Sequence, residues 1–294
     1  MVLTVLLGLL AVFAVGLIGL VLKAALSTGQ LSPSPEGAAI GAVTSFFDTL
    51  GIGNFAPTTA WFKFRKLLPD SHIPATLNVG HALPVIVQSA IFLILLGVAV
   101  DPILLTGCVI AAVLGAAVGA NLVVRAPVRT VQLVVGIALL IAAGLFAASN
   151  LNLMPAGGAA GGLPTPLLII AIAVHFVLGI LMAFGIGLYA PSLILLSLFG
   201  LDPRLAFPIM SSCCAFLMPS TALRFVRSDR IDLKVVLGMM IGGVPAVLLA
   251  ALVVKELPMV WLRWGVVLVV IYAALILLRD ALKPGEPAVQ KETL

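Results

Sequence analysis

The sequence has few charged residues. Asp, Glu, Lys and Arg together make up 9% of its 294 residues, whereas a typical soluble domain carries about 25%. A soluble protein of this length cannot cover its surface with so few charges, and disordered or coiled-coil proteins need abundant polar residues. Because 62% of the residues are apolar and the mean hydropathy is +1.28, most of the chain is expected to lie in lipid.

Cysteine is also scarce. Cys108, Cys213 and Cys214 all lie in apolar segments, and no two of them have CxxC spacing. This pattern argues against a disulfide framework and against a zinc site. The sequence likewise has no Walker A loop, no metal-ligand cluster and no supported Ser/His/Asp set. We therefore expect neither an enzyme nor a bound cofactor, and any transport would use an ion gradient or run downhill.

Long apolar runs dominate what is present. A bilayer-spanning helix needs about 20 residues, and seven runs reach that length: 3–26, 73–98, 102–124, 128–149, 205–226, 232–254 and 258–280. The sequence therefore predicts an all-α polytopic membrane protein. The N-terminal helix in 1–30 is expected to be retained, the Gly- and Pro-rich segment 150–163 to be a linker, and 283–294 to be a flexible tail.

Two further apolar stretches, 36–66 and 164–199, are interrupted by glycine and proline. The first contains Gly51-Ile-Gly-Asn-Phe-Ala-Pro57 and the second contains Gly185-Ile-Gly-Leu-Tyr-Ala-Pro191. Five of the seven positions are identical at an offset of 134 residues. Further matches follow in the same order along the chain, which predicts an internal duplication of 36–149 in 164–282.

The basic residues predict that the two halves have opposite orientations. Most of them gather in four segments: 63–72, 125–129, 224–234 and the C-terminal tail, and Arg204, Lys255 and Arg263 are exceptions to the pattern. The loops near 97–102 and 149–164 have none. By the positive-inside rule the basic segments are cytoplasmic. The repeats are then inverted, each interrupted stretch is a re-entrant hairpin, the N-terminus is outside and the C-terminus is cytoplasmic. The alternative is a single broken helix in place of each hairpin.

The hairpin tips combine the features of an anion site. A half-helix that starts near Pro57 or Pro191 presents unpaired N–H groups and partial positive charge. Two such ends meeting from opposite faces would hold an anion without any basic side chain. Candidate polar ligands near the tips are Asn54, Thr58, Thr59, Tyr189 and Ser192. The alternative is that the hydroxyl groups only cap the half-helices.

Other polar residues lie at membrane depth. Candidates to line the site are Asn78, His81, Ser211 and Ser212, on the spans that follow the hairpins. Asp48 and His175 are candidates to carry a coupling proton. Asp48 could instead accept hydrogen bonds from the tip turn, and the histidines and serines could form helix-to-helix hydrogen bonds.

The duplicated motif resembles that of the TauE/SafE family of membrane permeases, the sulfite exporters, and the resemblance extends from about residue 36 to 280. The family pattern usually has a run of glycines before the proline, where this sequence has Asn54 and Leu188. The resemblance implies a secondary transporter of sulfite, sulfoacetate or other organosulfonates in the cell (inner) membrane. The substrate would be held between the two tips at the midplane.

A passive channel for anions or small solutes, with the same fold, is the alternative function. The expected partners are a small anion, the lipid bilayer and protons as coupling ion, and no nucleic acid.

Overall fold

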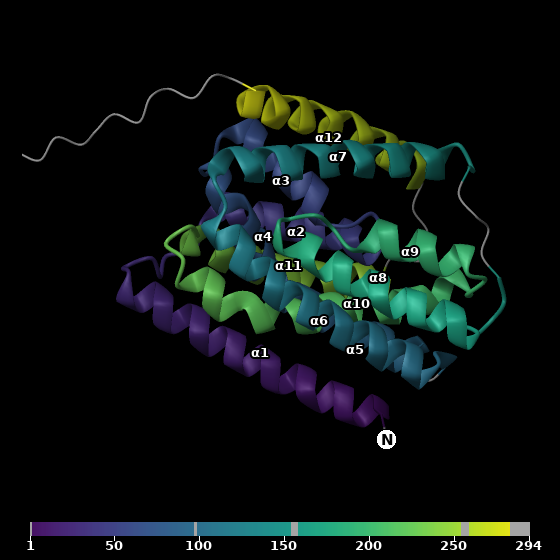
Figure 1. Cartoon of the computed structure of the whole chain (residues 1–294). Coiled ribbons are helices and arrows are strands. Elements are labelled where there is room, and N and C mark those ends of the chain that lie inside the picture. The colour runs from purple at the N-terminus through teal and green to yellow at the C-terminus, as the bar shows by residue number, and fades with distance from the viewer. Residues whose placement is uncertain (1, 97–98, 154–157, 254–258, 283–294) are drawn as a thin grey trace, which may run out of the picture.

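A computed structural model describes residues 2–96, 99–153, 158–253 and 259–282 (Figure 1). Its helices in chain order are α1 (Val2–Ser27), α2 (Pro35–Thr49), α3 (Phe55–Arg65), the 3-10 helix η1 (Asp70–His72), α4 (Ile73–Gly80), α5 (Ala82–Leu96), α6 (Pro102–Arg125), α7 (Val128–Asn150), α8 (Thr165–Ala183), α9 (Tyr189–Leu198), α10 (Pro203–Val226), α11 (Leu233–Val253) and α12 (Met259–Leu282). Within the described residues the only β-structure is an isolated bridge between Ala160 and Leu201. The predicted all-α class is confirmed.

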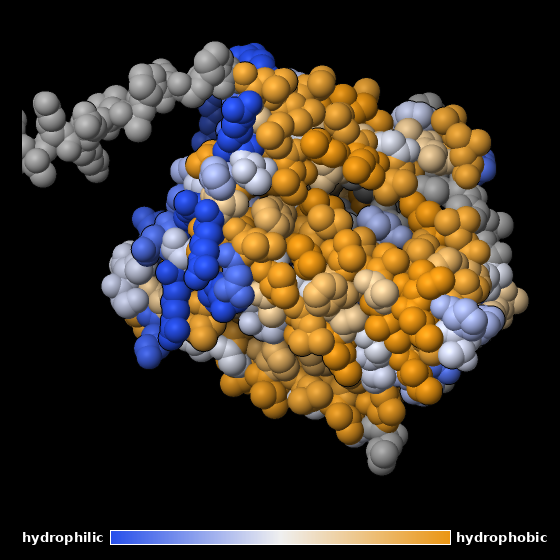
Figure 2. Space-filling model, viewed as in Figure 1, coloured by the Kyte–Doolittle hydropathy of each residue, from blue (hydrophilic) through white to orange (hydrophobic). Residues whose placement is uncertain are grey.

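Within these residues, seven stretches are long and apolar enough to cross a membrane: 2–27, 70–96, 102–125, 128–145, 165–183, 203–226 and 233–251. Six of them match predicted spans. The seventh is α8, which we predicted as the first arm of a hairpin, and the remaining predicted span forms α12. The space-filling view shows a broad apolar surface with hydrophilic residues gathered at one end (Figure 2). The predicted tail 283–294, and residues 154–157 of the predicted linker, lie outside the described residues.

Contacts between loops define the two ends of the bundle. At one end, the end with the basic residues, the Arg230 guanidinium donates to the carbonyl of Ala126, after the last residue of α6 (2.9 Å). At the other end, the backbone N–H of Asp101, just before α6, donates to the carbonyl of Gly161 (3.0 Å). Since α6 connects these two contacts, the basic end and the Asp101 end lie on opposite sides of the apolar layer.

Each interrupted stretch leaves one end of the bundle and returns to it. Arg65 at the end of α3 pairs with Glu36 at the start of α2, with 2.8 Å between Nε and Oε1. In the second stretch the backbone N–H of Ala160, before α8, donates to the carbonyl of Gly200, after α9 (3.4 Å). The pairs α2–α3 and α8–α9 are therefore hairpins, with their bases at opposite ends. The descent of the two halves from one duplicated, inverted unit stays a prediction.

The first arm of each hairpin packs on a helix of the other half. Helix α2 lies along α11, and α8 lies along α6. A Cβ atom placed on Gly41 of α2 would overlap the backbone of Met239, and one placed on Gly115 of α6 would overlap the carbonyl of Phe176. In lipid, small residues allow helix backbones to approach this closely. Each hairpin is thus held by the opposite half, which brings the two tips into the same layer.

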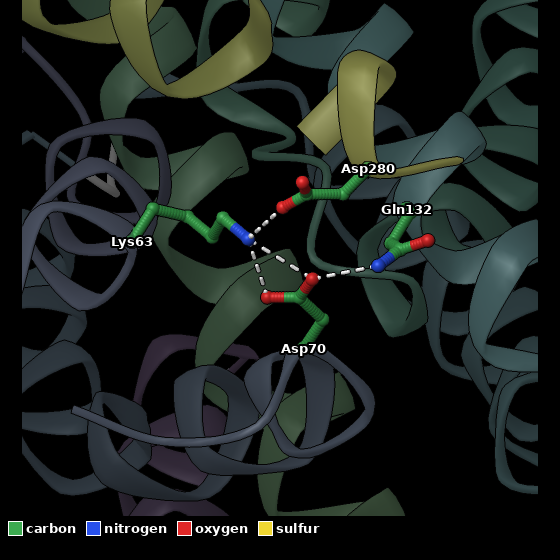
Figure 3. Close-up of polar contacts among 4 residues, drawn as sticks. All are labelled: Lys63, Asp70, Gln132 and Asp280. Atoms are coloured by element: carbon green, nitrogen blue, oxygen red, sulfur yellow. Dashed lines mark hydrogen bonds and ion pairs between the residues drawn. The ribbon is translucent and has the colours of Figure 1, made fainter. Parts of the chain in front are cut away.

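Helices α7 and α12 pack on each other along one side of the bundle (Figure 1). Helix α12 also packs on α3, and the Lys63 ammonium of α3 lies 2.7 Å from Asp70 and 3.2 Å from Asp280 (Figure 3). The Gln132 side chain of α7 donates to the same Asp70 carboxylate (2.8 Å). By contrast, the described residues give α7 no comparable packing on α9.

Candidate functional site

Both hairpins break at the predicted motifs. Gly51 has φ of 90° and Gly185 has φ of 93°, which is the left-handed region that glycine adopts without steric cost. These glycines end α2 and α8 and let the chain turn into α3 and α9 within five residues. The repeated Gly-Ile-Gly sequence therefore sets the position of both tips.

The half-helices α3 and α9 begin without a side-chain cap. Asn54 and Leu188 occupy the capping positions, and neither side chain bonds a backbone N–H there. Pro57 and Pro191 are the third residues of their helices, in the first turn where a missing N–H costs no intrahelical bond. The N–H groups at both helix starts thus remain available for a ligand.

The two tips meet at one cavity of about 400 Å³. A Cβ atom placed on Gly187 would lie 3.7 Å from the Cβ of Phe55, which shows that the tips are in contact. The cavity is lined by both tips together with residues of α5, α7, α8 and α10. This arrangement places the starts of α3 and α9 at a common space.

Two predicted site residues, Asn54 and Tyr189, line this cavity. They are 6% and 8% exposed, and the Asn54 Nδ2 and the Tyr189 hydroxyl have no hydrogen-bond partner among the described residues. A buried polar group without a partner costs about 1–3 kcal/mol. Both groups belong to residues of the cavity wall, so a polar ligand bound there is a candidate to supply the missing partners.

Comparison with known proteins identifies the second half of the chain. Residues 167–293 match the sequence model of the sulfite exporter TauE/SafE family. These residues are a TauE/SafE domain. No curated protein and no solved structure matches the chain. The predicted family is confirmed for these residues, and it is a family of membrane transporters rather than enzymes.

The TauE/SafE domain contributes the second tip, Tyr189 and the serine pair of α10, whereas Asp48 comes from the first half. Asp48 is 1% exposed, and neither carboxylate oxygen has a hydrogen bond within the described part of the chain. The side-chain amide of Gln88 and the backbone amide of Asn54 face it without closing a well-formed bond. Tyr189 and Cys214 also lie close to it. Asp48 thus lies behind the cavity wall, next to the residues that form it.

Gln88 was not among the predicted site residues. It is fully buried on α5, and both of its side-chain amide atoms are without a partner among the described residues. Its sequence signal was a single amide within an apolar span. That signal does not show which way the side chain points.

The predicted hydroxyl ligands are bonded to the two predicted histidines. Thr58 of α3 and His81 are 2.9 Å apart between Oγ1 and Nε2. Ser192 of α9 and His175 of α8 are 2.9 Å apart between Oγ and Nε2. Each hydroxyl belongs to the fourth residue of its half-helix, so neither caps the helix start. The capping alternative is wrong for both, and the hydroxyls tie each half-helix to a neighbouring helix.

Two of the remaining candidates, Asn78 and Ser212, join helices, whereas the Thr59 hydroxyl has no partner among the described residues. The Asn78 side chain donates to the carbonyl of Met182 at the end of α8 (3.0 Å). The Ser212 and Ser89 hydroxyls are 3.1 Å apart between α10 and α5, and the Ser211 hydroxyl donates to a carbonyl of its own helix. Predicted residues that are absent from the cavity wall are Asp48, Thr58, Thr59, Asn78, His81, His175, Ser192, Ser211 and Ser212.

Proposed function

We propose that the protein is a secondary transporter of small sulfur-containing anions, sulfite or organosulfonates, in the cell (inner) membrane. One observation carries the proposal: the starts of α3 and α9 meet at a cavity lined by Asn54 and Tyr189, each of which has a buried donor group without a partner among the described residues. Uncapped helix starts attract anions, and broken helices that meet within the bilayer are typical of secondary transporters. The TauE/SafE match supports the same class of function.

We assign two kinds of role to the predicted site residues. Asn54 and Tyr189 would contact the anion, together with backbone N–H groups of the tips. Thr58 with His81, and Ser192 with His175, would hold the half-helices at the correct distance from each other. Four further buried residues would support the surrounding helices: Thr59, Asn78, Ser211 and Ser212.

Asp48 would couple transport to protons. An anion at the tips and an ionised Asp48 would repel each other strongly, because little water separates them. Protonation of Asp48 removes this repulsion, so one proton is expected to bind with each anion. Asp48→Asn should therefore transport methanesulfonate, whose charge does not change near neutral pH, with little dependence on pH. Transport that keeps its full pH dependence in Asp48→Asn would point to another carrier, and His175 is the next candidate.

Orientation and mechanism follow from the charges and the hairpins. With the basic end in the cytoplasm, the N-terminus would lie outside and the C-terminus inside. The halves 36–149 and 164–282 would then be inverted repeats. Because one hairpin enters from each side, small movements of one half against the other would open the cavity to each side in turn.

Flux measurements in proteoliposomes test this function. A sulfite or proton gradient should drive saturable uptake, whereas a passive channel would give flux that does not saturate and ignores the proton gradient. Asn54→Ala with Tyr189→Phe should lower the flux at least about tenfold, because two hydrogen bonds to a charged group are lost. The matched control is Asn121→Ala with Tyr272→Phe, which changes the same residue types at exposed positions. Wild-type flux in the Asn54/Tyr189 variant would refute the site.

A further inference from the structure

The cavity at the tips is larger than the anion named by the family. Its volume is about 400 Å³. Sulfite has four non-hydrogen atoms and fills on the order of 100 Å³, if each takes about the volume of a water molecule. A cavity of this size is in the range that holds small organic ligands, about 300–1,000 Å³. Bare sulfite would leave most of the space unfilled.

The walls of the cavity divide into a polar part and an apolar part. The polar part is the tips, with Asn54 and Tyr189. The apolar part includes Val134 and Ala138 of α7 and Leu178 of α8. An anionic head group would be satisfied at the first part and repelled by the second, where hydrocarbon binds favourably. The two parts together fit a molecule with a charged head and an apolar body.

The apolar part reaches the lipid-facing surface of the protein. Ile137 and Ile141 of α7 line the cavity and are also 52% and 57% exposed. The surface is hollowed between α7 and the second hairpin (Figure 2). Since residues 128–145 form a candidate membrane span, this opening faces hydrocarbon. An apolar chain can extend from the tips toward it without meeting water.

We propose that the preferred substrate is an alkanesulfonate with several carbon atoms, whose sulfonate lies at the tips and whose chain lies against α7. The proposal rests on the proposed function and narrows its substrate class. It differs from a site for bare sulfite in one measurable respect, because it requires that affinity rises with chain length.

Binding of a homologous series to the purified full-length protein tests the proposal. The probes are sulfite and the methane-, butane- and octanesulfonates, used below the concentrations at which they form micelles, with thermal shift and calorimetry as readouts. Each buried methylene can raise affinity up to about fourfold. We expect butanesulfonate to bind on the order of tenfold or more tightly than methanesulfonate. Equal or falling affinity along the series would overturn the proposal.

A bulky substitution in the apolar part of the cavity tests whether the alkyl chain of the substrate lies there. Ala138→Phe should abolish the gain in affinity with alkyl chain length, and sulfite binding measured on the same variant shows whether the tips still form the anion site. Leu140→Phe, on the same helix but outside the cavity lining, is the matched control. If Ala138→Phe does not fold, Val134→Phe gives the same readout. An unchanged gain in the filled variant would place the chain elsewhere and refute the proposal.

The same series distinguishes a failure of the alkanesulfonate proposal from a failure of the anion site. Sulfite that binds without any gain from longer chains refutes the alkanesulfonate proposal and leaves the anion transporter standing. No binding of any anion, with butanol and butylammonium as neutral and cationic controls, would refute the anion site itself.

Discussion

The two hairpins have the same tips but different supports. The base of the first hairpin carries charges: Glu36 pairs with Arg65, and Lys63 pairs with Asp70 and Asp280. The base of the second is joined by backbone hydrogen bonds of Ala160. Helix α12 covers α3, whereas the described residues show no comparable cover of α9 by α7.

This difference separates an anchored side from an open side. The first hairpin packs on α12, and ion pairs join its two helices to each other, to η1 and to α12. We therefore expect it to keep its position during transport. The second hairpin borders the cavity and the opening beside α7. If one side rearranges to admit and release substrate, it should be the side of α7 and α9.

The largest effect should come from closing the gaps in which the hairpins are seated. Gly41→Leu and Gly115→Leu each place a side chain into the backbone of a neighbouring helix. Each should destabilise the fold by about 3 kcal/mol or more, measured by thermal unfolding and by the yield of monodisperse protein. Gly16→Leu, with open space around it, is the control. If Gly41→Leu melts like Gly16→Leu, the hairpin is not held in this way.

The next largest effect should be a difference in stability between variants at the bases of the two hairpins. Lys63→Met leaves the Asp70 and Asp280 carboxylates near each other without their shared cation. The loss should lower the free energy of unfolding by about 2 kcal/mol, a value between the typical costs of breaking an exposed and a buried ion pair. Arg204→Met at the other end should cost much less than Lys63→Met, because Arg204 is 81% exposed and water screens its pair with Asp202. Asp280→Asn in the Lys63→Met background should restore part of the loss. Equal losses for Lys63→Met and Arg204→Met would remove the contrast between the two sides.

The hydroxyl–histidine pairs should stabilise the fold by similar free energies in both hairpins. Thr58→Ala and Ser192→Ala should each cost about 1–2 kcal/mol, because a buried histidine nitrogen loses its partner. Thr221→Ala, whose hydroxyl bonds carbonyls of its own helix, should cost less. In flux assays the two hairpin variants should change the maximum rate more than KM, since neither hydroxyl lines the cavity. A rise in KM alone would show that these hydroxyls contact the anion.

The smallest effect should be the pH dependence of the Glu36–Arg65 pair. The Arg65 guanidinium donates to Glu36 and holds the pKa of that carboxyl below its usual value. Since the folded pKa is below the unfolded value of about 4.3, the pair stabilises the fold above that pH and is lost as the pH falls through the folded pKa. The Tm difference between wild type and Glu36→Gln should shrink on acidification below about pH 4. A difference that grows on acidification would contradict this sign.

The sequence was sufficient for the helices and the tips because their causes are local. An apolar run of about 20 residues can only be a span in lipid, and Gly51 and Gly185 mark the breaks because their backbone is left-handed. The position of the tips next to each other followed from charge asymmetry and from the repeated motif.

The partners of the polar residues could not be read in this way. Thr58 and Ser192 align at the repeat offset, but their histidines do not, since the positions that correspond to His81 and His175 are Ala215 and Gly41. Only a three-dimensional arrangement brings each histidine to its hydroxyl.

The cavity wall was equally hidden. In the sequence, Ile137 is one of many apolar residues of a span, and nothing distinguishes a side chain that borders a cavity from one that faces lipid. Among the predicted ligands, Asn54 and Tyr189 line the cavity and the others do not. The sequence indicates the type of each residue and its depth in the membrane, but not the direction in which its side chain points.

The packing of each hairpin's first arm on a helix of the other half also affects the order in which the protein can assemble during synthesis. Helix α2 can dock only when α11 exists, and Met239 is synthesised 198 residues after Gly41. Until then the glycine face of α2 has only lipid or a chaperone to contact. We therefore expect the first hairpin to insert late in synthesis, and a chain cut at the linker to yield no stable half.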